Sequence, residues 1–162
     1  MLWKGYTWNF RDGGIGGPGF AGWSANNIVG PDANDYVTLR LTNSGNSPVG
    51  AEMEATQSLG YGTYTLVVGS RLDNLDKNVV FGGLFPYFGG TPFIEFDVCE
   101  VSSWDGDGDF GNGVVYVSHN SWYGNPANPS RSHNSAVMDS GQVHTFVLRW
   151  EDRKSTRLNS SH

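Results

Sequence analysis

The sequence has few cysteines and no long apolar run. Among 162 residues there is one cysteine, Cys99, so an intrachain disulfide framework and a cysteine-rich zinc site are both excluded. No stretch approaches the roughly 18 apolar residues that a membrane helix needs, and the opening MLWKGYTWNF lacks the apolar core of a signal peptide. We therefore expect no membrane partner.

Basic charge is also scarce. The chain has 10 Lys and Arg residues against 16 Asp and Glu residues, which gives a formal net charge of −6 at pH 7. Acidic surfaces repel phosphate backbones, and no basic patch offsets the repulsion, so we expect no nucleic-acid partner.

Glycine and aromatic residues are abundant. The chain contains 23 Gly, 6 Trp, 7 Tyr and 9 Phe, a composition that suits short strands joined by tight turns and argues against disorder. Alternating apolar and polar residues predict strands at 37–42, 51–56, 61–69, 78–87, 93–101, 113–119 and 143–150. Turn-forming residues separate them at 43–50, 58–62, 88–92, 105–113 and 123–130. This spacing predicts an all-β antiparallel sandwich or jelly roll, in which only 71–78 holds a helical turn.

The last residues break this pattern. Segment 152–162 is polar, lacks glycine and holds three of the ten basic residues. We interpret it as a non-native extension, with an ordinary flexible terminus as the alternative. Residues 1–151 are then expected to form a single domain.

The most informative segment is the predicted strand at 93–101. Strict alternation would place Glu95 and Asp97 on one face but would turn Glu100 into the core, where an unpaired carboxylate is costly. A β-bulge at Val98 and Cys99 removes this conflict, because one extra residue returns Glu100 to the face of the other two acids.

Three clustered carboxyl groups suggest acid/base chemistry. At least one of their pKa values should rise, because neighbouring carboxylates disfavour one another's ionisation. Glu95 and Glu100 side chains that lean inward would approach the separation of about 5–5.5 Å that retaining glycoside hydrolysis requires. A solvent-facing acidic strand and a cation site are the alternatives.

The motif from Glu95 to Glu100 resembles the E-x-D-x-x-E signature of glycoside hydrolase family 16, in the form with the bulge residue. Further stretches agree with this resemblance; they are Trp23–Val29, Gly50–Met53, Ser58–Tyr64, Leu84–Tyr87 and His144–Trp150. The resemblance covers residues 8–151, about the N-terminal two-thirds of such a domain.

The resemblance implies a concanavalin-like jelly roll, expected to be incomplete here, and a secreted enzyme. It implies retaining endo-hydrolysis of β-1,3- or mixed β-1,3/1,4-glucan, with Glu95 as nucleophile, Glu100 as acid/base and Asp97 as the residue that tunes the nucleophile. An agarase, carrageenase or transglycosylase of the same family, and a non-catalytic carbohydrate-binding sandwich, are the alternatives. We expect a monomer whose partner is a β-linked polysaccharide.

Other residues are candidates for substrate binding. Aromatic planes can stack on sugar rings, although core packing is an equal alternative for each; these residues are Trp23, Tyr87, Trp104 and Trp122. Polar candidates for sugar hydroxyls are Asn26, Asn27, Glu52, Arg71, His119 and Asn120. Asp105, Asp107 and Asp109 resemble half of a calcium loop, but no glutamate completes it, so a solvated acidic turn is favoured. We expect no cofactor and leave a structural calcium ion open.

Overall fold

The computed structural model describes residues 1–16, 21–45, 47–104, 113–151 and 157–159. Within these residues the regular structure is almost entirely β, arranged in several mostly antiparallel sheets. This confirms the predicted all-β, sandwich-like class. The chain divides into two compact units, Met1–Gly60 and Tyr61–His162. No helix in the described part of the chain is long and apolar enough to cross a membrane.

The first unit consists of short strands. One antiparallel sheet contains β1 (Leu2–Trp3), β2 (Tyr6–Phe10) and β9 (Met53–Ala55). A second sheet has the order β3 (Ile15–Gly16), β4 (Ala21–Trp23), β8 (Ser47–Gly50) and β7 (Thr42–Ser44), with β4 and β8 parallel. A 3-10 turn, η1 (Ala25–Asn27), leads into β5 (Ile28–Val29), which pairs with β6 (Thr38–Leu39).

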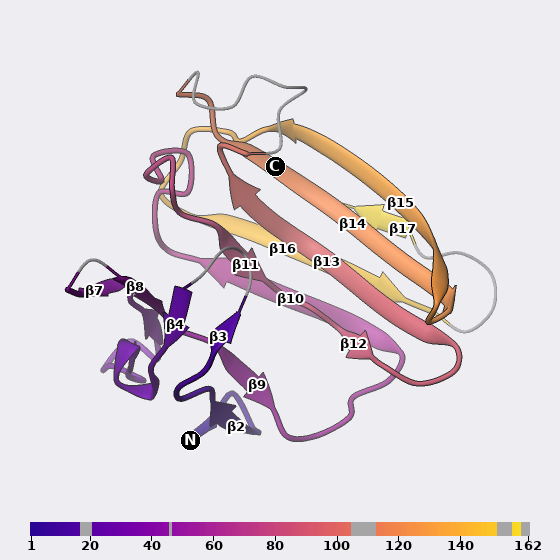
Figure 1. The fold of residues 1–162 in the computed structure, drawn as a ribbon, viewed down its shortest axis with the longest axis horizontal. Helices are drawn as coiled ribbons and strands as arrows, with labels where there is room; N and C mark the ends of the chain where they lie inside the picture. The colour runs from indigo at the N-terminus through magenta and orange to yellow at the C-terminus, as the bar shows by residue number, and fades with distance from the viewer. Residues whose placement is uncertain (17–20, 46, 105–112, 152–156, 160–162) are drawn as a thin grey trace. The chain divides into compact units, whose positions relative to one another are not determined.

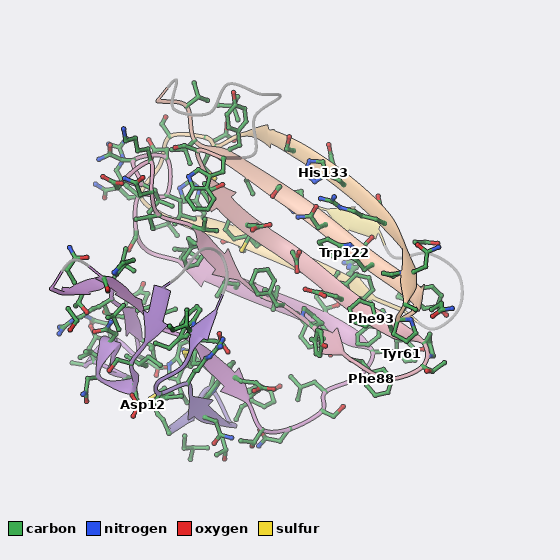
Figure 2. The ribbon with its side chains drawn as sticks, in the orientation of Figure 1. Asp12, Tyr61, Phe88, Phe93, Trp122 and His133 are labelled. Carbon is green, nitrogen blue, oxygen red and sulfur yellow. The ribbon has the colours of Figure 1, made fainter. Side chains whose placement is uncertain are left out.

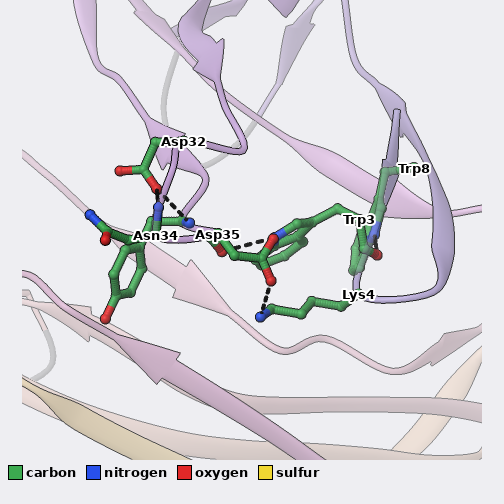
Figure 3. Close-up of polar contacts among 7 residues, drawn as sticks. Trp3, Lys4, Trp8, Asp32, Asn34 and Asp35 are labelled. Atoms are coloured by element: carbon green, nitrogen blue, oxygen red, sulfur yellow. Dashed lines mark hydrogen bonds and ion pairs between the residues drawn. The ribbon is translucent and has the colours of Figure 1, made fainter.

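Polar contacts join the β1–β2 hairpin to the loop at 32–36 (Figure 3). Trp3 donates its Nε1–H to the carbonyl oxygen of Asp35 at 3.1 Å, and Lys4 forms an ion pair with the Asp35 carboxylate. Asp32 shapes the loop itself, because its Oδ1 accepts hydrogen bonds from the backbone N–H groups of Asn34 and Tyr36 at 2.8 and 3.0 Å. Two segments about thirty residues apart in the chain are thereby held together.

The second unit contains two sheets. The larger has the order β11 (Phe81–Gly83), β13 (Phe93–Ser102), β14 (Tyr116–Asn125) and β15 (Asn128–Val137), and β12 (Tyr87–Phe88) also pairs with β13. The smaller has β10 (Gly62–Val68), β16 (His144–Trp150) and β17 (Arg157–Asn159). Figure 1 shows β13, β14 and β15 as three long strands lying side by side.

The core of this unit lies between its two sheets. Buried side chains from β13 and β14 contact buried side chains from β16; the cluster contains Leu72, Phe96, Val98, Cys99, Val101, Val115, Val117, Met138, Phe146 and Leu148. Phe96 of β13 also packs edge-to-face against Trp150 of β16, with ring centroids 5.5 Å apart. Because this apolar layer fills one face of β13, the opposite face is left to its acidic residues.

Several predicted strands are confirmed. Segments 61–69, 93–101 and 143–150 appear as β10, β13 and β16, and the strand expected at 113–119 begins at Tyr116 and continues to Asn125. The strand expected at 51–56 is reduced to Met53–Ala55.

Other local predictions were wrong. Segment 78–87 is not one strand, because β11 and β12 are separated by Leu84–Pro86, where Leu84 has a φ of +59° and Pro86 has no N–H to donate. Segment 37–42 is split between β6 and β7, and residues 71–78 form turns without a helix. The turn expected at 43–50 is a tighter hairpin between β7 and β8. Within segment 152–162, whose interpretation as a non-native extension stays a prediction, Arg157–Asn159 pairs with β16 as β17.

Candidate active site

A β-bulge in β13 organises the site. Asp97 pairs with Asn120 and Glu100 pairs with Ser118, so two residues of β13 face the single residue His119 of β14. Those two residues are Val98 and Cys99, which are buried at 2% and 0% exposure. The predicted bulge is therefore confirmed at the predicted position. It keeps Glu100 on the same face as Asp97 while both bulge side chains enter the core.

The bulge fits because β11 approaches it closely. Gly83 pairs with Cys99, and the Cys99 Sγ–H donates to the Gly83 carbonyl oxygen at 3.0 Å. A Cβ on Gly83 would lie only 2.8 Å from that sulfur and 2.5 Å from Leu66 Cδ2. A glycine on β11 is thus what leaves room for the second bulge residue.

Three rows of directly paired residues cross β13, β14 and β15 on the acidic face. In strand order the rows are Glu95, Trp122 and Arg131; Asp97, Asn120 and His133; and Glu100, Ser118 and Ser135. Directly paired residues share one face of a sheet, with Cβ atoms about 4.5–5.5 Å apart. Figure 2 shows Trp122 and His133 on the neighbouring strands β14 and β15. The three acids therefore lie beside polar, aromatic and basic side chains.

Burial and mutual repulsion perturb the acids. Asp97 is 7% exposed, and burial together with the nearby Glu95 and Glu100 carboxylates raises its pKa to about 7, against a smaller lowering by Arg131. Partial burial also raises the pKa of Glu95. The expectation that at least one pKa in this cluster rises is confirmed. Asp97 can therefore hold a proton near neutral pH, where an exposed aspartate is ionised.

Asn120 connects Glu100 to the edge strand β15. Its Nδ2 donates to Glu100 Oε2 at 3.2 Å, and its Oδ1 lies 2.6 Å from His133 Nδ1. Asn120 is 3% exposed, so water does not replace these partners. The predicted candidate Asn120 thus contacts a predicted catalytic residue directly.

Two aromatic candidates flank Glu95. Tyr87 of β12 pairs with Glu95 on one side and Trp122 of β14 pairs with it on the other. Tyr87 is 67% exposed and packs edge-to-face on Phe93. The guanidinium of Arg131 lies over the ring of Trp122, 5.2 Å from the ring centroid. Aromatic surface is therefore available on both sides of this glutamate.

The remaining candidates of the second unit lie elsewhere or have other partners. Trp104 follows β13 and donates its Nε1–H to the Lys77 carbonyl oxygen at 2.6 Å. Alternation along β14 sends His119 to the face opposite Asn120, and its Nδ1 contacts the carbonyl oxygen of the bulge residue Val98. Arg71 forms a two-point ion pair with Asp73, which lowers the pKa of that carboxyl group.

The candidates of the first unit include two residues with local structural roles. Asn27 is buried at 5% exposure, and its Nδ2 donates to Thr42 Oγ1 at 3.0 Å and to the Val49 carbonyl oxygen at 2.8 Å. Its amide therefore joins η1 to β7 and β8. Glu52 forms an ion pair with Arg11 at 2.9 Å.

The other two candidates of the first unit are Asn26 and Trp23. Asn26 lies within η1, and its backbone N–H is capped by Ser24 Oγ at 3.3 Å. Trp23 has Arg11 stacked over its ring at 4.8 Å, and its buried Nε1 has no hydrogen-bond partner among the described residues.

The weak candidates for a calcium site are three aspartates in segment 105–109. Asp105, Asp107 and Asp109 lie outside the described residues. Among the residues that the structure describes, no group of three or more His, Cys, Asp or Glu side chains is arranged to hold a metal ion.

Sequence reasoning missed two residues of the site, Arg131 and His133. Both lie on β15, whose sequence NPSRSHNSAV shows no apolar alternation. The only sequence signal for these residues was the run of Asn and Pro before them. It is typical of a hairpin turn and would have predicted that 128–137 pairs with the preceding strand.

Comparison of the chain with protein-family models, curated proteins and solved structures finds no match.

Proposed function

We propose that the protein is a retaining endo-glycoside hydrolase acting on β-1,3- or mixed β-1,3/1,4-glucan, as the resemblance to glycoside hydrolase family 16 implies. The observation that carries this proposal is the bulge at Val98 and Cys99, which keeps Glu95, Asp97 and Glu100 on one face of β13. A bulge that costs a ladder hydrogen bond to align three mutually repelling acids is better explained by chemistry than by stability.

The spacing of the two glutamates suits double displacement. Their β14 partners, Trp122 and Ser118, are four residues apart, which is about 13 Å of strand. Two glutamate side chains leaning toward each other over Asp97 shorten this span toward the separation of about 5–5.5 Å that retaining enzymes use.

Each acid has a role in this scheme. The Glu95 carboxylate attacks the anomeric carbon, while Glu100 gives its proton to the leaving glycosidic oxygen. Glu100, now ionised, then takes a proton from water, whose oxygen attacks the same carbon and releases Glu95. Asp97, whose pKa is raised to about 7, can stay protonated beside Glu95 and so limits the negative charge that must be desolvated beside the sugar.

Aromatic side chains support recognition of a sugar. Tyr87 and Trp122 flank Glu95 and offer planes on which the C–H faces of pyranose rings stack. Arg131, an exposed residue paired with Trp122, supplies donors for hydroxyl groups on the same face. We expect Tyr87→Ala and Trp122→Ala to raise KM for a polymeric substrate more than they lower kcat.

Incubation with laminarin and lichenan tests the proposal. New reducing ends should appear with the wild-type protein and with Glu151→Gln, a control at an exposed carboxylate directly after β16. Glu95→Gln and Glu100→Gln should each reduce their release by a factor of a thousand or more. Equal release by all four proteins would refute the assignment of the two glutamates.

A non-catalytic carbohydrate-binding role is the second candidate. The exposure of Tyr87 beside the site favours it, because stacking needs no acid chemistry. Retained binding of laminarin with no release of reducing ends would establish this role in place of the hydrolase. Agarose and carrageenan, tested in the same assay, and the detection of transglycosylation products would identify the other members of the family's range.

A further inference from the structure

Asn120 is held in one amide orientation by two partners. An asparagine side chain has a donating end and an accepting end, and a buried one needs partners at both. Here Nδ2 donates to Glu100 Oε2 at 3.2 Å and Oδ1 faces His133 Nδ1 at 2.6 Å. Since Oδ1 only accepts, His133 must carry its proton on Nδ1 and donate it.

The reverse orientation is unfavourable on both sides. Turning the amide over would place Oδ1 against the Glu100 carboxylate, where two acceptors repel each other. It would also place the Nδ2 hydrogens against the Nδ1–H of His133, where two donors compete. A proton on His133 Nδ1 therefore selects the orientation in which Asn120 donates to Glu100.

We infer that His133 is a positioning residue for Glu100, acting through Asn120. By fixing the amide of Asn120, His133 keeps a hydrogen bond directed at the ionised Glu100 carboxylate. This inference rests on the proposed function, in which Glu100 alternates between its protonated and ionised states. His133 is an exposed residue on the far side of β14 from Glu100, and it acts on that carboxyl group through Asn120, with which it is directly paired between β14 and β15.

Other groups around this row also bear on its titration. They are Glu95, Asp97 and Glu100 on β13, His119 on β14, Arg131 and His133 on β15, and Tyr87 on β12. Arg131, Glu95 and Asp97 act on Glu100 through their charges. These charges remain when position 133 is replaced by any neutral residue. An effect that depends on a donor at position 133 is therefore separable from theirs.

Three variants separate the donor from bulk and charge. His133→Phe keeps a ring without the Nδ1–H, and His133→Ala removes both. His133→Asn places an amide nitrogen near the position of Nδ1 and so restores a neutral donor. Asn134→Ala is the matched control, because Asn134 is an exposed neighbour on β15 that points to the opposite face.

The first readout is the titration of the Glu100 carboxyl carbon, followed by NMR in the free protein and assigned with Glu100→Gln. Without a donor at position 133 the amide of Asn120 is less firmly held, and the weakened hydrogen bond to Glu100 should move this titration to higher pH by about 0.5–1 unit in His133→Phe and His133→Ala. His133→Asn and Asn134→Ala should titrate like the wild type. The basic limb of the pH profile of kcat/KM with laminarin should move in the same direction by the same amount.

The outcomes distinguish the two proposals. Unchanged titration in a folded His133→Phe protein, or an equal shift in His133→Phe and His133→Asn, would overturn the positioning role of His133. Absence of hydrolysis at any pH, combined with the expected NMR shifts, would refute the proposed function and leave the His133–Asn120–Glu100 link standing.

Discussion

Replacing Asp97 by asparagine should stabilise the protein at neutral and alkaline pH. Asp97 is buried between Glu95 and Glu100, and its pKa of about 7 lies about three units above the ordinary value of 3.8. The native state therefore binds this proton more tightly than the unfolded state does. The resulting stabilisation is complete below about pH 4 and is lost as the pH rises through 7.

The size of the effect follows from the shift. Each pKa unit corresponds to about 1.4 kcal/mol, so three units give an order-of-magnitude loss of about 4 kcal/mol between pH 4 and pH 8. Asp97→Asn removes the ionisation but keeps the shape of the side chain. Its unfolding free energy should thus decline less with pH than that of the wild type, and at pH 8 it should be the more stable protein.

Denaturant unfolding at intervals from pH 4 to pH 8 measures this difference. Glu151→Gln, at an exposed position in the same unit, should follow the wild-type curve. Parallel curves for the wild type and Asp97→Asn would refute the reasoning, because they would show that Asp97 ionises as easily in the native state as in the unfolded chain.

Further predictions concern the surroundings of the three acids. Arg131→Ala should raise the pKa of Asp97 further, since Arg131 lowers it, and should steepen the decline of stability between pH 4 and pH 8 in the same measurement. The Cys99 thiol, whose pKa is raised to about 12 by burial, should react with a disulfide reagent only at the rate of unfolding; fast labelling of the native protein would contradict its place in the core. Gly83→Ala should lower the free energy of unfolding by about 1–3 kcal/mol through overpacking, whereas Gly62→Ala, where the nearest atom is 4.0 Å away, should cost much less.

The acidic strand was predictable because its pattern is local. Apolar and acidic residues alternate from Ile94 to Asp97, and the cost of burying Glu100 implied the bulge that β13 contains. The positions of the three acids and the rise of at least one of their pKa values could be predicted from that same segment.

The side of the site that β15 forms could not be predicted in this way. Strand β15 is polar from Ser130 to Ser135, and its register comes from the tight hairpin with β14.

The hydrogen-bond partners of individual polar residues could not be predicted from local sequence patterns either. Asn27 looked like a residue that could bind sugar hydroxyls, but its amide is used by Thr42 and Val49, fifteen and 22 positions away. Asn120 has the same chemistry and instead contacts Glu100 and His133. What distinguishes the two asparagines is the pairing of distant strands, which composition and alternation do not encode.

On the proposed function, Glu95 forms a covalent bond to the anomeric carbon of the sugar. Incubation with 2,4-dinitrophenyl 2-deoxy-2-fluoro-β-laminaribioside tests it directly, because attack by Glu95 expels dinitrophenolate and leaves an ester that hydrolyses slowly. Peptide mapping by mass spectrometry should find one fluoroglycosyl group, attached to Glu95, and none in Glu95→Gln. A label on Asp97 or Glu100, or an unlabelled protein that still hydrolyses laminarin, would contradict the assignment of Glu95 as nucleophile.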